Sequence, residues 1–179
     1  HFKNHKCVTL AKMQMAAGAV GMTCAKLGEA EILVQNGILD VLIANQIVGD
    51  LKTKRLAALA KTASVGVAID CLEQAVAISQ AALQAQSQVH LFIEVDIGMG
   101  RCGVAPGKPA LELARSIQTL SNVVFGGLQA FEGHLVNVLD RGERGSKAVS
   151  AMQLALNSRT YLEENGIQVP CVTGCSSAT

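Results

Sequence analysis

The chain has 179 residues, of which 50% are hydrophobic and 16% are charged, and its formal net charge is +1. Nucleic-acid-binding proteins carry basic patches and aromatic stacking surfaces, whereas this chain is near neutral, with 3% aromatic residues and no Trp. No apolar run reaches the roughly 20 residues that a membrane span needs. We therefore expect neither a nucleic acid nor a membrane as its partner.

Six cysteines are scattered along the chain, and no Cys-x-x-Cys spacing occurs. Cysteines in apolar segments usually behave as small buried hydrophobic residues, and a reducing compartment keeps them as thiols. This pattern predicts a cytoplasmic protein or one of an organelle matrix.

Short β-favouring runs alternate with helical periodicity along the chain. The predicted strands cover residues 20–25, 40–45, 65–70, 90–97, 123–131 and 169–173, and the predicted helices cover residues 5–17, 27–36, 50–62, 71–85, 110–120 and 146–164. Such alternation predicts an α/β protein with a parallel sheet that is covered on both faces. An open doubly wound sheet and a (β/α)8 barrel both satisfy the pattern.

Polar side chains stand near the carboxyl end of almost every predicted strand. A barrel gathers such groups from all its strands at one mouth, whereas an open sheet concentrates them at one switch point, so we predict a TIM-type barrel. A truncated first strand ending at residues 2–3 would bring the number of βα units to about seven, and a whole barrel needs about 250 residues. We therefore expect residues 1–179 to form one barrel domain that is incomplete at both ends. The strand-end residues are Lys3, Thr23, Cys24, Asn45, Asp70, Asp96, Arg101, Gln129, Glu132, His134, Ser176 and Ser177.

The central stretch 90–104 (HLFIEVDIGMGRCGV) reads as a buried strand followed by a glycine-rich turn that carries Arg101. A strand that ends in glycines and a cation is where an α/β protein places a ligand. The spelling Gly98-x-Gly100-x-x-Gly103 also matches a dinucleotide fingerprint, but prolines at 106 and 109 delay the next helix and no acidic residue follows at the required distance. A turn without a ligand is a further alternative.

Three other segments carry candidate groups. Residues 1–6 (HFKNHK) place Lys3 among basic side chains. A partly desolvated amine there could act as a nucleophile. The alternative is a basic N-terminal stub on the surface. Residues 174–179 (GCSSAT) form a turn that could hold a phosphate through amides and hydroxyls, or an ordinary polar loop. Phe131 could lie on a flat cofactor ring or in the core, and His134 alone favours a structural role. Residues 140–144 favour a solvated charged face.

Taken in order, these segments resemble the fold-type III pyridoxal-phosphate enzymes, and most closely the D-threonine aldolase and D-serine dehydratase group. The resemblance covers nearly the whole chain. Residues 1–6 match a His-x-Lys-Thr-His-Lys pattern, and further matches lie at 18–31 (GAVGMTCAKLGEAE), 43–45 (IAN), 94–104 (EVDIGMGRCGV) and 127–134 (GLQAFEGH). The resemblance implies the N-terminal barrel of an alanine racemase-like enzyme.

The resemblance also implies roles for single residues. Lys3 aligns with the lysine that bonds covalently to pyridoxal phosphate, and Arg101 aligns with an arginine beside the phenolic oxygen of the cofactor. Phe131 falls where the group places a Tyr or His against the pyridine ring. The phosphate would lie on the turn formed by Gly174, Cys175, Ser176, Ser177 and Thr179. Weaker candidates for the substrate side or for support of the site are Asn45, Asp96, Gln129 and His134.

Three positions depart from the group. Asn4 replaces the usual Thr, Phe131 lacks the hydroxyl of a Tyr, and residues 174–179 replace Gly-Gly-Ser-Thr-Gly-Thr, which removes two glycines. The group holds a divalent metal (Mn, Mg or Zn) in a C-terminal β-domain, so we expect the metal only in the full-length protein and no metal ligand in this chain.

The function that the resemblance implies is cleavage of D-threonine or a related D-3-hydroxy amino acid into glycine and an aldehyde, by a full-length homodimer. This fragment alone is expected to be inactive. A D-serine dehydratase of the same group and a non-catalytic pyridoxal-phosphate-binding barrel are the alternatives.

Overall fold

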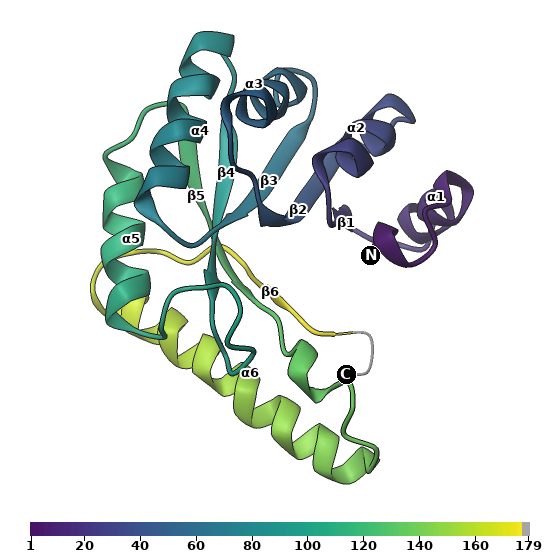
Figure 1. Cartoon of the computed structure of the whole chain (residues 1–179), viewed down its shortest axis with the longest axis vertical. Coiled ribbons are helices and arrows are strands. Elements are labelled where there is room, and N and C mark those ends of the chain that lie inside the picture. Colours follow the sequence, from purple (N-terminus) through teal and green to yellow (C-terminus); the bar gives the residue numbers. More distant parts are fainter. Residues whose placement is uncertain (177–179) are drawn as a thin grey trace. The chain divides into compact units, whose positions relative to one another are not determined.

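The computed structural model describes residues 1–176, in which helices and strands alternate (Figure 1). The strands are β1 (Met22–Cys24), β2 (Asp40–Gln46), β3 (Ser64–Ile69), β4 (Val89–Val95), β5 (Val123–Ala130) and β6 (Val172–Gly174). The α-helices are α1 (Val8–Ala16), α2 (Leu27–Gln35), α3 (Asp50–Leu59), α4 (Leu72–Ala85), α5 (Lys108–Gln118) and α6 (Arg141–Glu164). Short 3₁₀ helices, η1 (Phe2–Asn4) and η2 (Gly133–Leu135), complete the described elements.

The sheet has six strands in the order β1-β2-β3-β4-β5-β6, so each strand neighbours the next one along the chain. A doubly wound sheet reverses its order at a switch point, whereas a (β/α) barrel adds its strands in sequence. The predicted fold class is therefore confirmed: the described chain supplies six strands of the (β/α) barrel type, with helices between them.

The chain divides into two compact units. The first contains His1–Ile69, Glu73–Leu91 and Leu120–Val124. Within it, β2 pairs in parallel with both β1 and β3, and α2 packs on β1 and β2 (Figure 1). Apolar side chains on alternate positions of β1 and β2 are buried, which fixes the register of these two strands because a shift by one residue would expose them. Strand β3 is buried at every position from Val65 to Ile69.

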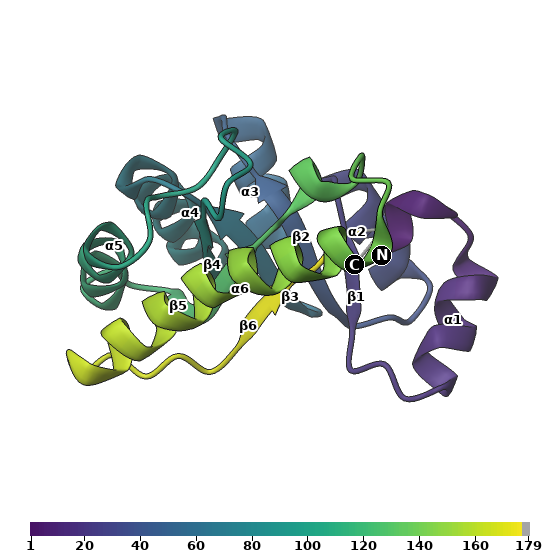
Figure 2. The same ribbon diagram turned by 90° about the horizontal axis from the view of Figure 1, so that it is seen from below.

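The second unit contains Asp70–Leu72, Phe92–Thr119 and the chain from Phe125 onward. In it β5 pairs in parallel with β6, with Gln129 opposite Thr173. Helices α5 and α6 pack on each other, and α6 also lies along β6 (Figure 2). One face of α5 is apolar and buried, and it consists of Ala110, Leu113, Ala114 and Ile117.

The ends of the elements show where the sequence prediction fails. The expected first strand at residues 2–3 is wrong: these residues lie in η1, where His5 and Lys6 donate their amides back to the carbonyl of Phe2 and close a turn. Helix α6 begins at Arg141 rather than at residue 146, since the Asp140 carboxylate accepts the Glu143 amide at 2.7 Å and caps it. The charged segment 140–144 is therefore the cap and first turn of a helix.

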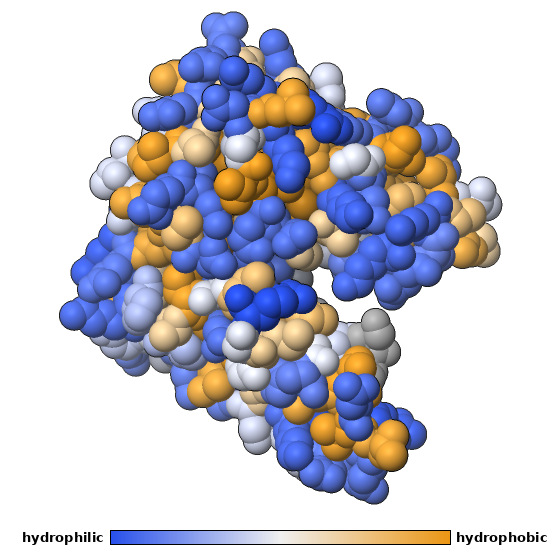
Figure 3. Space-filling model, in the orientation of Figure 1, coloured by the Kyte–Doolittle hydropathy of each residue, from blue (hydrophilic) through white to orange (hydrophobic). Residues whose placement is uncertain are grey.

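The face seen in Figure 3 is largely hydrophilic, with hydrophobic side chains in separate groups. Val20 and Leu139 are the most exposed large apolar side chains of the described residues. No helix among residues 1–176 is both long and apolar enough to cross a membrane.

Candidate functional site

The second unit brings together two of the predicted cofactor residues. Arg101 lies on the loop after β4, and its guanidinium carbon is 5.5 Å from the centroid of the Phe131 ring, which follows β5. Arg101 is exposed and Phe131 is half-buried. A guanidinium at this distance from a ring is attracted by its π-system. The pair therefore presents a cation and an aromatic surface at the ends of β4 and β5.

The loop that carries Arg101 is organised around the carboxylate of Asp96. Its Oδ1 accepts the amides of Gly98 and Gly100, each at 3.0 Å, and its Oδ2 accepts the Gly100 amide at 3.2 Å. The Gly100 amide, followed by the amides of Gly98 and Met99 and the charge of His134, lowers the pKa of Asp96, against an opposing effect of burial.

The same geometry argues against the dinucleotide interpretation. In that motif the glycine amides and the first turn of a helix directly below them bind the pyrophosphate. Here the amides of Gly98 and Gly100 donate to Asp96, and α5 begins only at Lys108.

The His134 ring lies beside the same loop. His134 lies in η2, and a Cβ atom built on Gly98 would be only 3.1 Å from its Nε2 atom. The imidazole is exposed. Of the predicted residues, Asp96, Arg101, Phe131 and His134 are therefore gathered around one loop.

Gln129, another predicted residue, is buried beside an acidic side chain that the prediction missed. Its Nε2 donates to Oε2 of Glu94 at 3.3 Å, and the two residues are 5% and 4% exposed. The Gln129 Oε1 atom has no hydrogen-bond partner among the described residues. The signal that could have revealed Glu94 is its place in the apolar run of β4, since buried carboxylates are rare without a partner.

A second buried carboxylate, that of the strand-end residue Glu132, accepts an amide of the turn after β6. Glu132 is 0% exposed, and its Oε1 accepts the Ser176 amide at 2.8 Å. Gly174, the last residue of β6, and Cys175, which follows it, are exposed. A Cβ on Gly174 would lie 2.6 Å from the Ala130 carbonyl oxygen. Since Ser176 donates its amide to Glu132, that amide is already engaged. The predicted phosphate residues Ser177 and Thr179 lie outside the described residues.

Lys3 and Asn45 belong to the first unit. Lys3 is exposed in η1, where its amide donates to Nδ1 of His1 at 3.3 Å. Asn45 is exposed in β2, and its side-chain amide donates to the Ala25 carbonyl at 3.4 Å. The lysine amine thus lies on the short segment that precedes α1.

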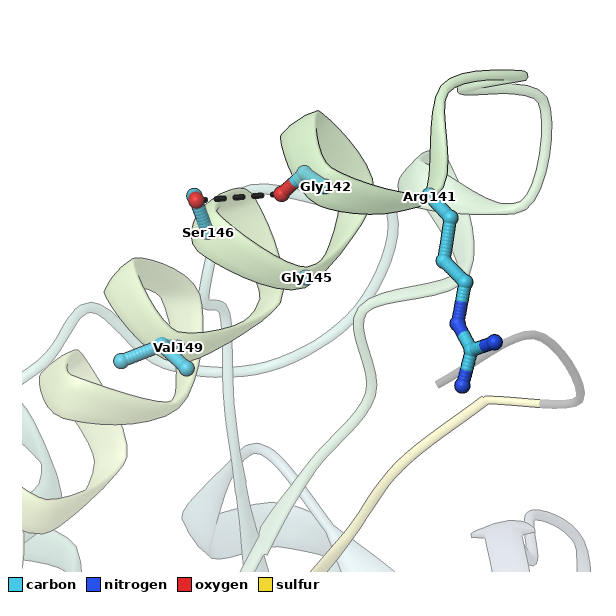
Figure 4. Close-up of a pocket in the computed structure, with 5 residues that line it drawn as sticks. All are labelled: Arg141, Gly142, Gly145, Ser146 and Val149. Carbon is cyan, nitrogen blue, oxygen red and sulfur yellow. Dashed lines mark hydrogen bonds between the residues drawn. The ribbon is translucent and has the colours of Figure 1, made fainter.

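The first turns of α6 border a shallow hollow in the second unit. It is lined by Arg141, Gly142, Gly145, Ser146 and Val149, and Figure 4 shows Arg141 pointing away from the Ser146 and Val149 side chains. The Ser146 hydroxyl donates to the Gly142 carbonyl at 3.0 Å. None of these lining residues is a predicted site residue. Within residues 1–176, His, Cys, Asp and Glu side chains form no group of three that could hold a metal ion.

Comparison with known proteins gives a consistent family. Residues 2–179 match the model of the alanine racemase N-terminal domain. The chain is 38% identical to D-threonine aldolase of Arthrobacter sp over 174 residues, 97% of this chain and 46% of that protein. It is 35% identical to 3-hydroxy-D-aspartate aldolase of Paracoccus denitrificans (strain Pd 1222) over 176 residues, with the same coverage of 97% and 46%.

A solved structure agrees with the sequence matches. The crystal structure of D-threonine aldolase from Filomicrobium marinum superposes with a TM-score of 0.94 at 38% identity, and the match covers 97% of this chain and 47% of that one. The chain therefore spans about half the length of the relatives it matches. The predicted resemblance to the fold-type III group is confirmed, and the chain belongs to the alanine racemase N-terminal domain family.

Proposed function

We propose that the full-length protein is a pyridoxal-phosphate-dependent aldolase that cleaves D-threonine or a related D-3-hydroxy amino acid into glycine and an aldehyde. The observation that carries the proposal is the Arg101–Phe131 pair, at 5.5 Å, in a chain 38% identical to a D-threonine aldolase. The names of the two curated relatives support cleavage of this substrate class.

The residues of the second unit suit the ring of the cofactor. Pyridoxal phosphate, when bound, withdraws electrons from the α-carbon of an amino acid and so stabilises negative charge there. Phe131 offers a half-buried aromatic surface for a flat heterocycle, and Arg101 offers a positive charge beside it. A guanidinium can donate hydrogen bonds to an anionic phenolic oxygen and favour its charged form. Phe131 has no hydroxyl, so it can support the ring but cannot move a proton.

The other assignments are carried over residue by residue from the family. Lys3 would bond covalently to the cofactor, and the turn at 174–179 would hold its phosphate. Gly174 pairs with Ala130 at the end of β6, and the turn assigned to the phosphate follows directly. Glu132 already takes the Ser176 amide, so we assign the phosphate to other donors of that turn.

The decisive assay offers substrates to the full-length protein with pyridoxal phosphate and Mn²⁺. D-Threonine should yield equal amounts of glycine and acetaldehyde, since breaking the Cα–Cβ bond leaves these two products. 3-Hydroxy-D-aspartate would instead give glycine and glyoxylate. Pyruvate and ammonia from D-serine would indicate a dehydratase. Cofactor binding without any of these products would leave a non-catalytic barrel and overturn the proposal.

The lysine assignment has its own test. Borohydride reduction fixes a lysine-bound cofactor, and peptide mapping then identifies the modified residue. We expect the label on Lys3 and its loss in Lys3→Ala. Lys12→Ala is the matched control, because Lys12 is an exposed lysine of neighbouring α1. Label on any other lysine would place the covalent bond elsewhere.

A further inference from the structure

The loop that presents Arg101 is closed at its base by backbone hydrogen bonds. Val104 donates its amide to the Glu94 carbonyl and accepts the Asp96 amide, both at 2.9 Å. These bonds form an isolated parallel bridge between Val95 and Val104. The chain therefore leaves β4 at Asp96 and returns beside it at Val104, so that Arg101 lies on a closed loop.

Two carboxylates hold the amides inside this loop. Asp96 accepts the Gly98 and Gly100 amides, and Oδ2 of Asp70, which follows β3, accepts the Gly103 amide at 3.1 Å. The lowered pKa of Asp96 agrees with this arrangement, because amide donors favour the charged carboxylate. Arg101 therefore lies between amides that are fixed on either side of it.

The loop also has little freedom to relax into another shape. Gly103 has a φ of +107°, and a Cβ there would lie 2.7 Å from the Asp96 amide nitrogen. Its backbone is packed directly against the start of the loop, so the two ends cannot separate without breaking the bridge. The part that the Asp96 carboxylate holds is the tip, residues 98–101.

We propose that Asp96 is a positioning residue, whose carboxylate holds the loop tip and thereby fixes Arg101 over Phe131. Asp70 supports the far side of the same loop. A carboxylate at a strand end could instead bind the ammonium group of a substrate. Both oxygens of Asp96, however, accept amides of its own loop. The part of the proposal that concerns cofactor binding rests on the proposed function. The part that concerns the fixed conformation of the loop tip rests on the loop geometry alone.

The two roles respond differently to removal of the charge. Asp96→Asn keeps an oxygen at the place where Oδ1 accepts the Gly98 and Gly100 amides, so this variant should still hold the tip. It would fail to bind an ammonium group. Asp96→Ala could neither hold the loop tip nor bind an ammonium group. The test therefore compares Asp96→Asn with Asp96→Ala in the full-length protein, with Glu112→Ala as control, since Glu112 is an exposed carboxylate of α5.

Hydrogen exchange in the cofactor-free protein gives the first readout. A hydrogen bond to a charged group stabilises the closed loop strongly. Its loss should therefore speed amide exchange in the peptide that contains Gly98 and Gly100 by about tenfold or more. We expect this in Asp96→Ala, a smaller change in Asp96→Asn and none in Glu112→Ala. Unchanged exchange in Asp96→Ala would overturn the proposal, and this arm does not depend on cofactor binding.

Affinity for pyridoxal phosphate gives the second readout. Asp96→Ala should weaken binding by about tenfold, but by less than about twofold in an Arg101→Ala background, because a residue that acts through Arg101 has nothing left to position. Equal losses in both backgrounds, or a loss in Asp96→Asn as large as in Asp96→Ala, would overturn it. If the wild-type protein binds no cofactor, the proposed function fails, and the exchange result still decides the role of Asp96 in the loop.

Discussion

Gly127→Ala should lower the stability of the second unit strongly, although it adds only one methyl group. Gly127 lies in β5 with a φ of +135°, and a Cβ there would be 2.0 Å from the Cys171 carbonyl oxygen. The next residue, Leu128, donates its amide to that same oxygen at 2.9 Å. The substitution therefore strains the backbone, pushes the segment before β6 away and weakens the hydrogen bond that joins them.

The expected loss is the sum of these effects. Backbone strain at a glycine-only conformation costs about 1–3 kcal/mol, and overpacking costs about 1–3 kcal/mol. Weakening of the Leu128 bond adds up to about 1 kcal/mol, so we expect a total of about 2–7 kcal/mol. Urea denaturation followed by circular dichroism should show a midpoint lower by about 1 M or more.

The matched control is Gly145→Ala in the same unit. Gly145 is exposed in α6, and a Cβ there meets no atom within 4 Å. Alanine should stabilise that helix by up to about 1 kcal/mol. If Gly127→Ala unfolds at the same urea concentration as Gly145→Ala, the close approach of Gly127 to Cys171 does not constrain the fold.

Three further predictions follow from single side chains. The lowered pKa of Asp96 stabilises the folded state above about pH 4, and this stabilisation is lost as the pH falls through the folded-state pKa. Asp96→Asn should therefore flatten the acid limb of a plot of unfolding free energy against pH. An unchanged acid limb would contradict this. Burial, with the charge of Glu29, raises the pKa of Cys24 to about 12, whereas amide donors led by Leu10 lower that of Cys7. A thiol reagent at pH 8 should therefore label Cys7 before Cys24, as peptide mass spectrometry would show. Glu132→Ala should cost about 1–3 kcal/mol, because it leaves the Ser176 amide without its acceptor; Glu132→Gln, which keeps an oxygen, should cost less in the same urea measurement.

The alternating elements could be predicted because their signals are local. Helix α2 was predicted at residues 27–36 and found at Leu27–Gln35, and β3 was predicted at 65–70 and found at Ser64–Ile69. Apolar periodicity reports which face of an element is buried, and that is sufficient to place it. The polar strand ends then favoured a barrel, which the sequential strand order confirms.

The ends of the elements and the partners of buried groups could not be read in this way. The turn at Phe2–Asn4 depends on which amides reach the Phe2 carbonyl. Glu132 and Ser176 are 44 positions apart, and Glu94 and Gln129 are 35 apart. Such contacts depend on the register of neighbouring strands, which no local pattern encodes. Arg101 and Phe131 could be paired only through the family resemblance.

The two outermost strands of the sheet are also its shortest. Strand β1 covers Met22–Cys24 and β6 covers Val172–Gly174, whereas each of the four strands between them has at least six residues. An outer strand offers its free backbone groups as a template on which a foreign strand can add, and the hazard grows with its length. A strand of three residues offers only a few backbone groups with which an added strand could form hydrogen bonds. Within residues 1–176, β1 and β6 therefore offer an added strand fewer backbone partners than any of the four strands between them would offer.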